Sequence, residues 1–181
     1  MQVYEPAEDS YFLAKIVKDY VLRLNNKDIL VLDMGTGSGI QSDNIIKLGI
    51  KKKNILAVDV NQDALNYVKR KLKVKTLKSN LFEKVKGKYF LVLFNPPYLA
   101  EDKYDKMPDT TGGKNGDETI IRFIKQIKKH LVDEGVCFLL TSSYTPEKTW
   151  KLEVKKQKLK VKKIAKKALF YEKLYIWEIK K

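Results

Sequence analysis

The chain has 181 residues, of which 44% are hydrophobic, and this is enough for one buried core but not for two ordinary domains with a linker. We therefore expect a single domain over residues 1–181. No run of 18 apolar residues occurs, and the opening residues are acidic, which argues against a membrane span or a signal peptide and predicts a cytoplasmic protein. Cys137 and His130 are the only cysteine and histidine, so neither a disulfide nor a metal site is expected.

The formal charge of +15 would attract nucleic acid electrostatically. However, proteins that read bases rely on arginine, whereas the cations here are nearly all lysines spread through almost every segment. A general compositional bias, such as adaptation to heat, explains this pattern equally well. The charge therefore leaves nucleic-acid or ribosomal proximity open without favouring it.

Helical patterns alternate with short apolar runs along the chain. Helices are expected at 10–24, 40–48, 63–72, 118–131 and 145–157. Strands are expected at 29–32, 55–58, 74–78, 89–94, 135–140, 161–168 and 174–179. This alternation predicts an α/β fold with a doubly wound, mainly parallel, seven-stranded sheet, and the last two strands predict an antiparallel hairpin at its edge. The polar segment 100–117 is longer than most connections, which is typical of functional loops.

A glycine-rich loop follows the first predicted strand. Gly35 and Gly37 would let the backbone approach a ligand closely, and the start of the next helix could receive a carboxylate. In open α/β sheets ligands bind at the carboxyl ends of the strands, where this loop lies. Asp33, just before the loop, could bind the amine of a cofactor or cap the glycine turn. Such a loop alone would also suit NAD or a phosphate.

Two further strand ends carry residues suited to a nucleoside. Asp59 lies 20 residues after Gly39, where a carboxylate can accept hydrogen bonds from both ribose hydroxyls, a spacing that also fits NAD. Asn80 and Leu81 follow the third strand and are candidates to contact an adenine, although Asn80 could equally be an ordinary turn residue.

The sequence Asn95-Pro96-Pro97-Tyr98 directly follows the apolar run 89–94 and predicts methyl transfer to a planar NH2 group. The Asn95 carboxamide and the Pro96 carbonyl can accept both hydrogens of a planar NH2 group, and the prolines keep the backbone stiff and free of N–H donors. Tyr98 could clamp the flat group or simply pack in the wall. A hydride transferase has no evident use for paired acceptors, whereas S-adenosylmethionine would satisfy every element, with its methyl facing Asn95.

The opening sequence Val3-Tyr4-Glu5-Pro6-Ala7-Glu8-Asp9-Ser10, together with the glycine loop, Asp59 and Asn95-Pro96-Pro97-Tyr98, resembles the HemK/PrmC-type methyltransferases. The resemblance is closest to their short archaeal and eukaryotic branch, which modifies class 1 translation release factors. It implies a class I S-adenosylmethionine-dependent methyltransferase fold and N5-methylation of the glutamine in the release factor's Gly-Gly-Gln loop. It also implies a small zinc-binding activator protein as a heterodimer partner.

The same resemblance places the substrate amide at Asn95 and contacts with the cofactor at a set of matching positions. These positions are Ser10, Asp33, Gly35, Asp59, Asn80 and Leu81. Many relatives carry Asp at position 80, whereas this chain has Asn, whose carboxamide oxygen can still accept from an adenine amino group.

Alternative functions remain open at this point. Adenine N6, cytosine N4 and guanine N2 are also planar NH2 groups, so an RNA or DNA base methyltransferase would use the same turn. The sheet consumes nearly all of the chain and leaves only segment 100–117 to read a target base, which disfavours a DNA enzyme. Other possibilities are a protein substrate methylated on lysine and a non-catalytic scaffold, in which Asn95 would be dispensable.

Overall fold

The computed structural model describes residues 5–98 and 112–181. In these residues one seven-stranded sheet has the order β3-β2-β1-β4-β5-β7-β6. The strands are β1 (Val31–Met34), β2 (Ile55–Asp59), β3 (Lys75–Lys78), β4 (Tyr89–Phe94), β5 (Leu131–Ser142), β6 (Lys160–Ala168) and β7 (Lys173–Lys180). Strands β1 to β5 pair in parallel, and β7 pairs antiparallel with both β5 and β6. The predicted mainly parallel sheet with a C-terminal hairpin is confirmed.

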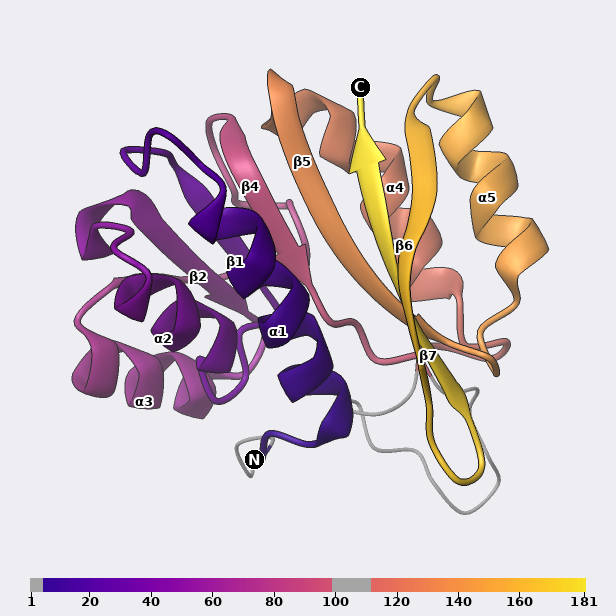
Figure 1. Cartoon of the computed structure of the whole chain (residues 1–181), viewed down its shortest axis with the longest axis horizontal. Coiled ribbons are helices and arrows are strands. Elements are labelled where there is room, and N and C mark those ends of the chain that lie inside the picture. The colour runs from indigo at the N-terminus through magenta and orange to yellow at the C-terminus, as the bar shows by residue number, and fades with distance from the viewer. Residues whose placement is uncertain (1–4, 99–111) are drawn as a thin grey trace.

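Helices cover both faces of this sheet, as Figure 1 shows, with α1 in front and α4 and α5 behind. They are α1 (Glu8–Leu22), α2 (Ile40–Lys47), α3 (Gln62–Leu72), α4 (Glu118–His130) and α5 (Glu147–Lys156), with a short 3-10 turn η1 (Lys52–Asn54) before β2. Each face has its own apolar core, because successive strand side chains point to opposite sides. Val31 joins the core with Phe12 of α1, whereas Leu32 joins the core with Ile120 of α4 and Trp150 of α5.

The order of the strands reverses between β1 and β4. The chain builds outward from β1 through β2 to β3, and then returns to place β4 on the other side of β1. At such a switch point the connections leave in opposite directions, which opens a crevice at the carboxyl ends of the two central strands. Apart from Ser10 in α1, the predicted cofactor and substrate residues lie near the carboxyl ends of β1, β2, β3 and β4, so the topology gathers them at this edge.

Two strands differ from the sequence prediction by two or more residues at both ends. Strand β1 begins and ends two residues later than expected, and Asp33 lies within its pairing, opposite Ala57, although its side chain is a carboxylate. Strand β5 begins four residues before Gly135, with a register shift against β4. A Cβ atom at Gly135 would lie 2.9 Å from the Val132 carbonyl oxygen. This glycine therefore permits an irregular strand interior rather than marking a strand start.

The lone cysteine and the lone histidine both pack against other parts of the chain. Cys137 is buried in β5, and burial raises the pKa of its thiol well above the usual value. The His130 ring stacks on Phe82 with centroids 4.5 Å apart, and its Nδ1 lies 3.0 Å from the Gly87 carbonyl oxygen. Across the described ranges, three or more potential metal ligands do not come together, and no helix has the length and apolar character of a membrane span.

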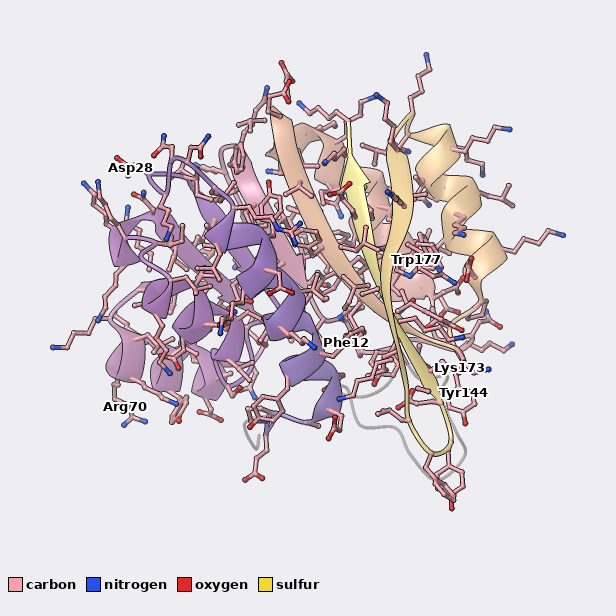
Figure 2. The ribbon with its side chains drawn as sticks, viewed as in Figure 1. Phe12, Asp28, Arg70, Tyr144, Lys173 and Trp177 are labelled. Atoms are coloured by element: carbon pink, nitrogen blue, oxygen red, sulfur yellow. The ribbon has the colours of Figure 1, made fainter. Side chains whose placement is uncertain are left out.

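The lysines project around the outline of the molecule, and their nitrogen-tipped side chains are visible on several elements in Figure 2. Many of their ion pairs are solvent-exposed, such as Lys47 with Asp43 and Lys51 with Asp28. Exposed pairs of this kind typically contribute less than about 1 kcal/mol each. These surface ion pairs therefore contribute little to the free energy of unfolding.

Candidate functional site

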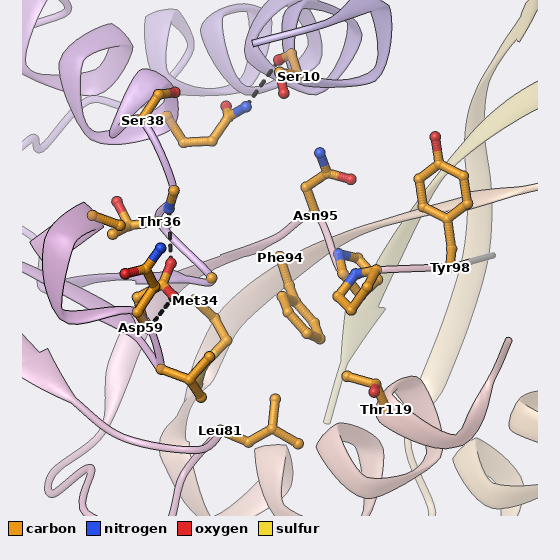
Figure 3. A pocket seen from close by; sticks show the side chains of 18 of the residues that line it. Ser10, Met34, Thr36, Ser38, Asp59, Leu81, Phe94, Asn95, Tyr98 and Thr119 are labelled. Atoms are coloured by element: carbon orange, nitrogen blue, oxygen red, sulfur yellow. Dashed lines mark hydrogen bonds between the residues drawn. The ribbon is translucent and has the colours of Figure 1, made fainter. Parts of the chain in front are cut away.

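A pocket of about 290 Å³ lies at the switch point. The predicted residues at its wall are Ser10, Gly35, Gly37, Asp59, Asn80, Leu81, Asn95, Pro96, Pro97 and Tyr98. Figure 3 shows several of these side chains around one space, contributed by α1, the glycine loop and the ends of the strands. Residues separated by up to 88 positions in the chain thus share one cavity, as expected from the fold. Asp33 is the one predicted residue that does not line it.

The glycine loop turns from β1 into α2 with a left-handed backbone at three glycines. The φ angles are 64° at Gly35, 50° at Gly37 and 76° at Gly39. At Gly39 a Cβ atom would also lie 2.9 Å from a methyl carbon of Val68 in α3. Because α2 begins at Ile40, directly after this turn, the backbone N–H groups of Ile40 and Gln41 have no helix carbonyl to donate to and can bind an anion in the pocket.

Asp33 lies beneath the glycine loop, with only 2% of its surface exposed. Its Oδ2 accepts hydrogen bonds from the hydroxyls of Thr36, at 2.8 Å, and Ser42, at 2.6 Å, and from the Ser42 backbone N–H at 3.2 Å. Burial raises the pKa of this carboxyl to about 6, against the opposing effect of those hydrogen bonds. Asp33 therefore ties the end of β1 to the loop and α2, a position that differs from the predicted direct contact with a cofactor.

Asp59 holds the other side of the loop. Its Oδ2 accepts from the Gly37 backbone N–H at 2.9 Å, and its Oδ1 accepts from the Asn61 backbone N–H at 2.9 Å. Asp59 also lines the pocket. A carboxylate oxygen can accept more than one hydrogen bond, so this side chain can organise the loop and still accept from a ligand hydroxyl.

The turn after β3 presents Leu81 to the pocket in an unusual conformation. Leu81 is buried and has a φ of 50°, in the left-handed region that non-glycine residues rarely adopt. Ser79 fixes this turn, because its hydroxyl donates to the Leu81 carbonyl at 2.9 Å and accepts from the Lys84 backbone N–H at 3.0 Å. Strain of this kind persists only where the surroundings enforce it, and it commonly occurs at ligand sites. Asn80 beside it is exposed.

The Asn95 carboxamide has a defined orientation. Its Nδ2 donates to Asp9 Oδ2 at 2.9 Å, while the other Asp9 oxygen accepts from the Ser10 backbone N–H at 2.6 Å. A carboxylate can accept but not donate, so the amide must turn its nitrogen toward Asp9. Asn95 Oδ1 is buried and has no hydrogen-bond partner in the described part of the chain. In Figure 3 this oxygen lies on the side of Tyr98. The turn therefore presents a buried acceptor, fixed in direction, at the wall of the pocket.

The acceptor turn is supported from the segment that precedes α4. A Cβ atom at Gly112 would lie 2.7 Å from the Pro97 carbonyl oxygen and 2.5 Å from that of Gly116. The Gly112 carbonyl in turn accepts from the Thr119 backbone N–H at 3.1 Å. The backbone at Gly112 thus packs directly against the turn. The remainder of the predicted functional loop, up to residue 111, lies outside the described residues.

Sequence reasoning missed several residues of this wall. They are Asp9, Gln41, Ser79, Thr119 and Arg122. Asp9 belongs to the opening sequence that carried the family resemblance, so that motif was the available signal. Gln41, one residue into α2, carries no such signal, because a polar residue at a helix start is ordinary.

The family described as "Methyltransferase small domain" matches residues 12–171 of this chain. The chain is a member of that family. The match spans the glycine loop, Asp59 and the acceptor turn, so these parts of the pocket wall belong to a methyltransferase domain.

Relatives and solved structures agree with this assignment. The methyltransferase is 40% identical to a protein of Methanocaldococcus jannaschii that is provisionally named a protein N5-glutamine methyltransferase; the match covers 81% of this chain and 76% of the relative. It is 29% identical to the mouse methyltransferase HEMK2, over 82% of this chain and 76% of the relative. The resemblance to the HemK/PrmC-type enzymes is thereby confirmed.

A solved structure confirms the fold. The methyltransferase superposes with a TM-score of 0.81 on a chain of the E. cuniculi Mtq2–Trm112 complex, which is described as responsible for methylation of the eRF1 translation termination factor. The superposition covers 100% of this chain and 99% of that one, at 24% identity. The class I methyltransferase fold that the sequence predicted is therefore present.

The buried carboxyl of Asp33 gives a testable dependence of stability on pH. The folded methyltransferase holds this proton with a pKa of about 6. The unfolded chain should release it near pH 4, so Asp33's contribution to the free energy of unfolding is greatest below pH 4 and is lost as the pH rises through 6. In Asp33→Asn this dependence should disappear.

Urea denaturation of both proteins between pH 4 and pH 7 checks this expectation. The difference in free energy of unfolding, native minus variant, should fall by up to about 3 kcal/mol across the range. A difference that stays constant with pH would show that Asp33 does not titrate in this window.

Proposed function

We propose that this methyltransferase transfers a methyl group from S-adenosylmethionine to N5 of the glutamine in the Gly-Gly-Gln loop of a class 1 translation release factor. The observation that carries the proposal is the orientation of Asn95, whose nitrogen is anchored on Asp9 and whose buried oxygen has no partner in the described residues. A buried acceptor left unpaired costs stability, so its position is best explained by a ligand that donates to it. The names of the relatives support a glutamine amide as that ligand.

The pocket suits S-adenosylmethionine. The start of α2 offers backbone donors to a carboxylate, Asp59 offers acceptors to ribose hydroxyls, and the turn at Asn80 and Leu81 can contact an adenine. When bound, S-adenosylmethionine supplies an electrophilic methyl group. We assign Asp33 a supporting role through the glycine loop, because its carboxylate is engaged by Thr36 and Ser42 beneath the wall.

The protein's own contribution is to position and polarise the amide. An amide nitrogen is a poor nucleophile because its lone pair is delocalised into the carbonyl. Asn95 Oδ1 and the Pro96 carbonyl would accept its two hydrogens, which fixes the direction of the nitrogen and stabilises the positive charge that develops on it. Asp9 supports this geometry by holding the Asn95 carboxamide in place through the hydrogen bond from its Nδ2. The nitrogen becomes strongly acidic once methylated, so no side chain has to remove a proton beforehand.

Tyr98 would hold the flat amide group against this turn. Its side chain lines the pocket and packs on the apolar core beneath α1. An aromatic ring fixed on one face by the core can cover a planar group on the other with little loss of conformational freedom.

The proposal includes partners. The substrate is the release factor, and a small zinc-binding activator protein would form a heterodimer with this chain, as the family resemblance implies. A cytoplasmic location follows from that substrate. The charge of +15 is compatible with proximity to the ribosome or another nucleic acid. The second candidate is methylation of an RNA base amino group, which would use the same acceptor turn.

The deciding experiment measures transfer of labelled methyl from S-adenosylmethionine to the release factor, with and without the activator. A release factor with Gln changed to Asn in the Gly-Gly-Gln loop, together with tRNA and DNA, serves as control. We expect label only on the intact loop. Label on RNA would instead establish the base methyltransferase, and no label on any acceptor would contradict both functions.

Replacing Asn95 tests the acceptor directly. Asn95→Ala should lower the rate of methyl transfer by on the order of 10²-fold or more, because one preorganised polar group is lost. The affinity for S-adenosylhomocysteine should change little. Asn44→Ala is the matched control, since the Asn44 carboxamide also donates to α1, at the Ala14 carbonyl, but does not line the pocket. A near-native rate in Asn95→Ala would remove Asn95 from the mechanism.

Asp9 should act through Asn95, and a double-mutant cycle can show it. Asp9→Ala frees the carboxamide to turn, so we expect a rate loss of roughly tenfold, smaller than that of Asn95→Ala. In the combined variant the rate should be no lower than in Asn95→Ala alone, because the two residues work as one unit. Rate losses that multiply would show that Asp9 acts independently.

A further inference from the structure

Gln41 carries a second buried acceptor in the same pocket. Only 5% of its surface is exposed, and it lines the wall at the first turn of α2. Its Nε2 donates to the Ser10 carbonyl at 2.9 Å, while its Oε1 has no hydrogen-bond partner in the described residues. A carbonyl oxygen can only accept, so Ser10 forces the nitrogen of Gln41 toward α1 and leaves the oxygen for another donor.

A ligand that satisfies this oxygen must donate a hydrogen bond. Three groups of S-adenosylmethionine can donate: the ribose hydroxyls, the adenine amino group and the ammonium group of the methionine part. The ribose and adenine belong at Asp59 and at the turn of Leu81, which follow β2 and β3. Gln41 lies instead where α2 begins, beside the backbone donors suited to the carboxylate that shares a carbon with the ammonium. The ammonium group is therefore the donor that its position fits.

We propose that Gln41 Oε1 accepts a hydrogen bond from the ammonium group of S-adenosylmethionine. The proposal rests on the proposed cofactor and assigns part of its recognition to a residue that has no place in the predicted site. Asp33, the acidic residue expected to bind this amine, does not line the pocket and has its Oδ2 engaged by Thr36 and Ser42. Gln41 supplies an acceptor at the wall itself.

The arrangement repeats that of Asn95. In both cases the first turn of α1 accepts from the amide nitrogen, through the side chain of Asp9 or the carbonyl of Ser10, and the amide oxygen is left without a partner in the described residues. The adjacent residues Asp9 and Ser10 thus orient two acceptors. The oxygen of Gln41 would face S-adenosylmethionine, and the oxygen of Asn95 would face the nitrogen that receives the methyl group.

Calorimetric titration of Gln41→Leu with S-adenosylhomocysteine and with 5′-methylthioadenosine tests the proposal. The first ligand carries the ammonium and carboxylate groups, and the second lacks both. We expect the Kd for S-adenosylhomocysteine to rise about tenfold or more, as for loss of a hydrogen bond to a charged group, and the Kd for methylthioadenosine to stay unchanged. A third ligand, S-adenosylhomocysteine with hydrogen in place of its amino group, should bind the native protein and the variant equally.

Gln62→Leu is the matched control, because it makes the same change at an exposed position of α3. Thermal unfolding without ligand verifies that both variants fold. Equal weakening of all three ligands would show that Gln41 only shapes the pocket and would overturn the proposal, as would unchanged binding of S-adenosylhomocysteine. If the native protein binds none of the ligands, the proposed cofactor itself fails.

Discussion

The packing of α1 across the sheet is the constraint on which the pocket depends. Leu13 and Val17 of this helix are fully buried, and their apolar contacts fix where its first turn meets the carboxyl ends of the strands. That turn then accepts hydrogen bonds from side chains that come from β4 and α2. A residue near the start of the chain thereby determines which way an amide 86 positions later faces. The direction of the acceptors is a property of the tertiary structure and not of the acceptor turn alone.

Carboxylates organise the other half of the pocket at a cost to stability. Asp33 occupies a buried position inside a central strand, where an apolar side chain would pack without desolvation. Its hydrogen bonds to Thr36 and Ser42 offset part of that cost and hold the glycine loop from below, while Asp59 holds the loop from its side. The loop is thus hydrogen-bonded on two sides without any ligand, an arrangement that would reduce the entropy lost on binding.

The sequence was sufficient for the order and type of the elements, and for the part of the pocket wall that the strand ends supply, because parallel strands place their carboxyl ends at one edge. It was not sufficient where side chains meet through tertiary packing. The position of Asp33 beneath the loop depends on a hydrogen bond from Ser42, nine residues away, and the sequence did not show that this oxygen is already engaged. Asp9 and Gln41 were missed as acceptor-orienting residues because the partner of each lies on another element, 86 and 31 positions away. The pattern of apolar residues also misplaced two strand bounds, because Asp33 lies inside β1 and Gly135 lies inside β5.

Gly112 shows how far the requirements of the acceptor turn extend. Its α-carbon faces the Pro97 and Gly116 carbonyl oxygens so closely that any side chain would displace backbone rather than a flexible neighbour. In a saturation mutagenesis experiment, position 112 would therefore behave like a catalytic position, intolerant of every substitution, although it carries no chemical group. Variants at this position would lose methyl transfer because even the single carbon atom of an alanine side chain would not fit beside the turn.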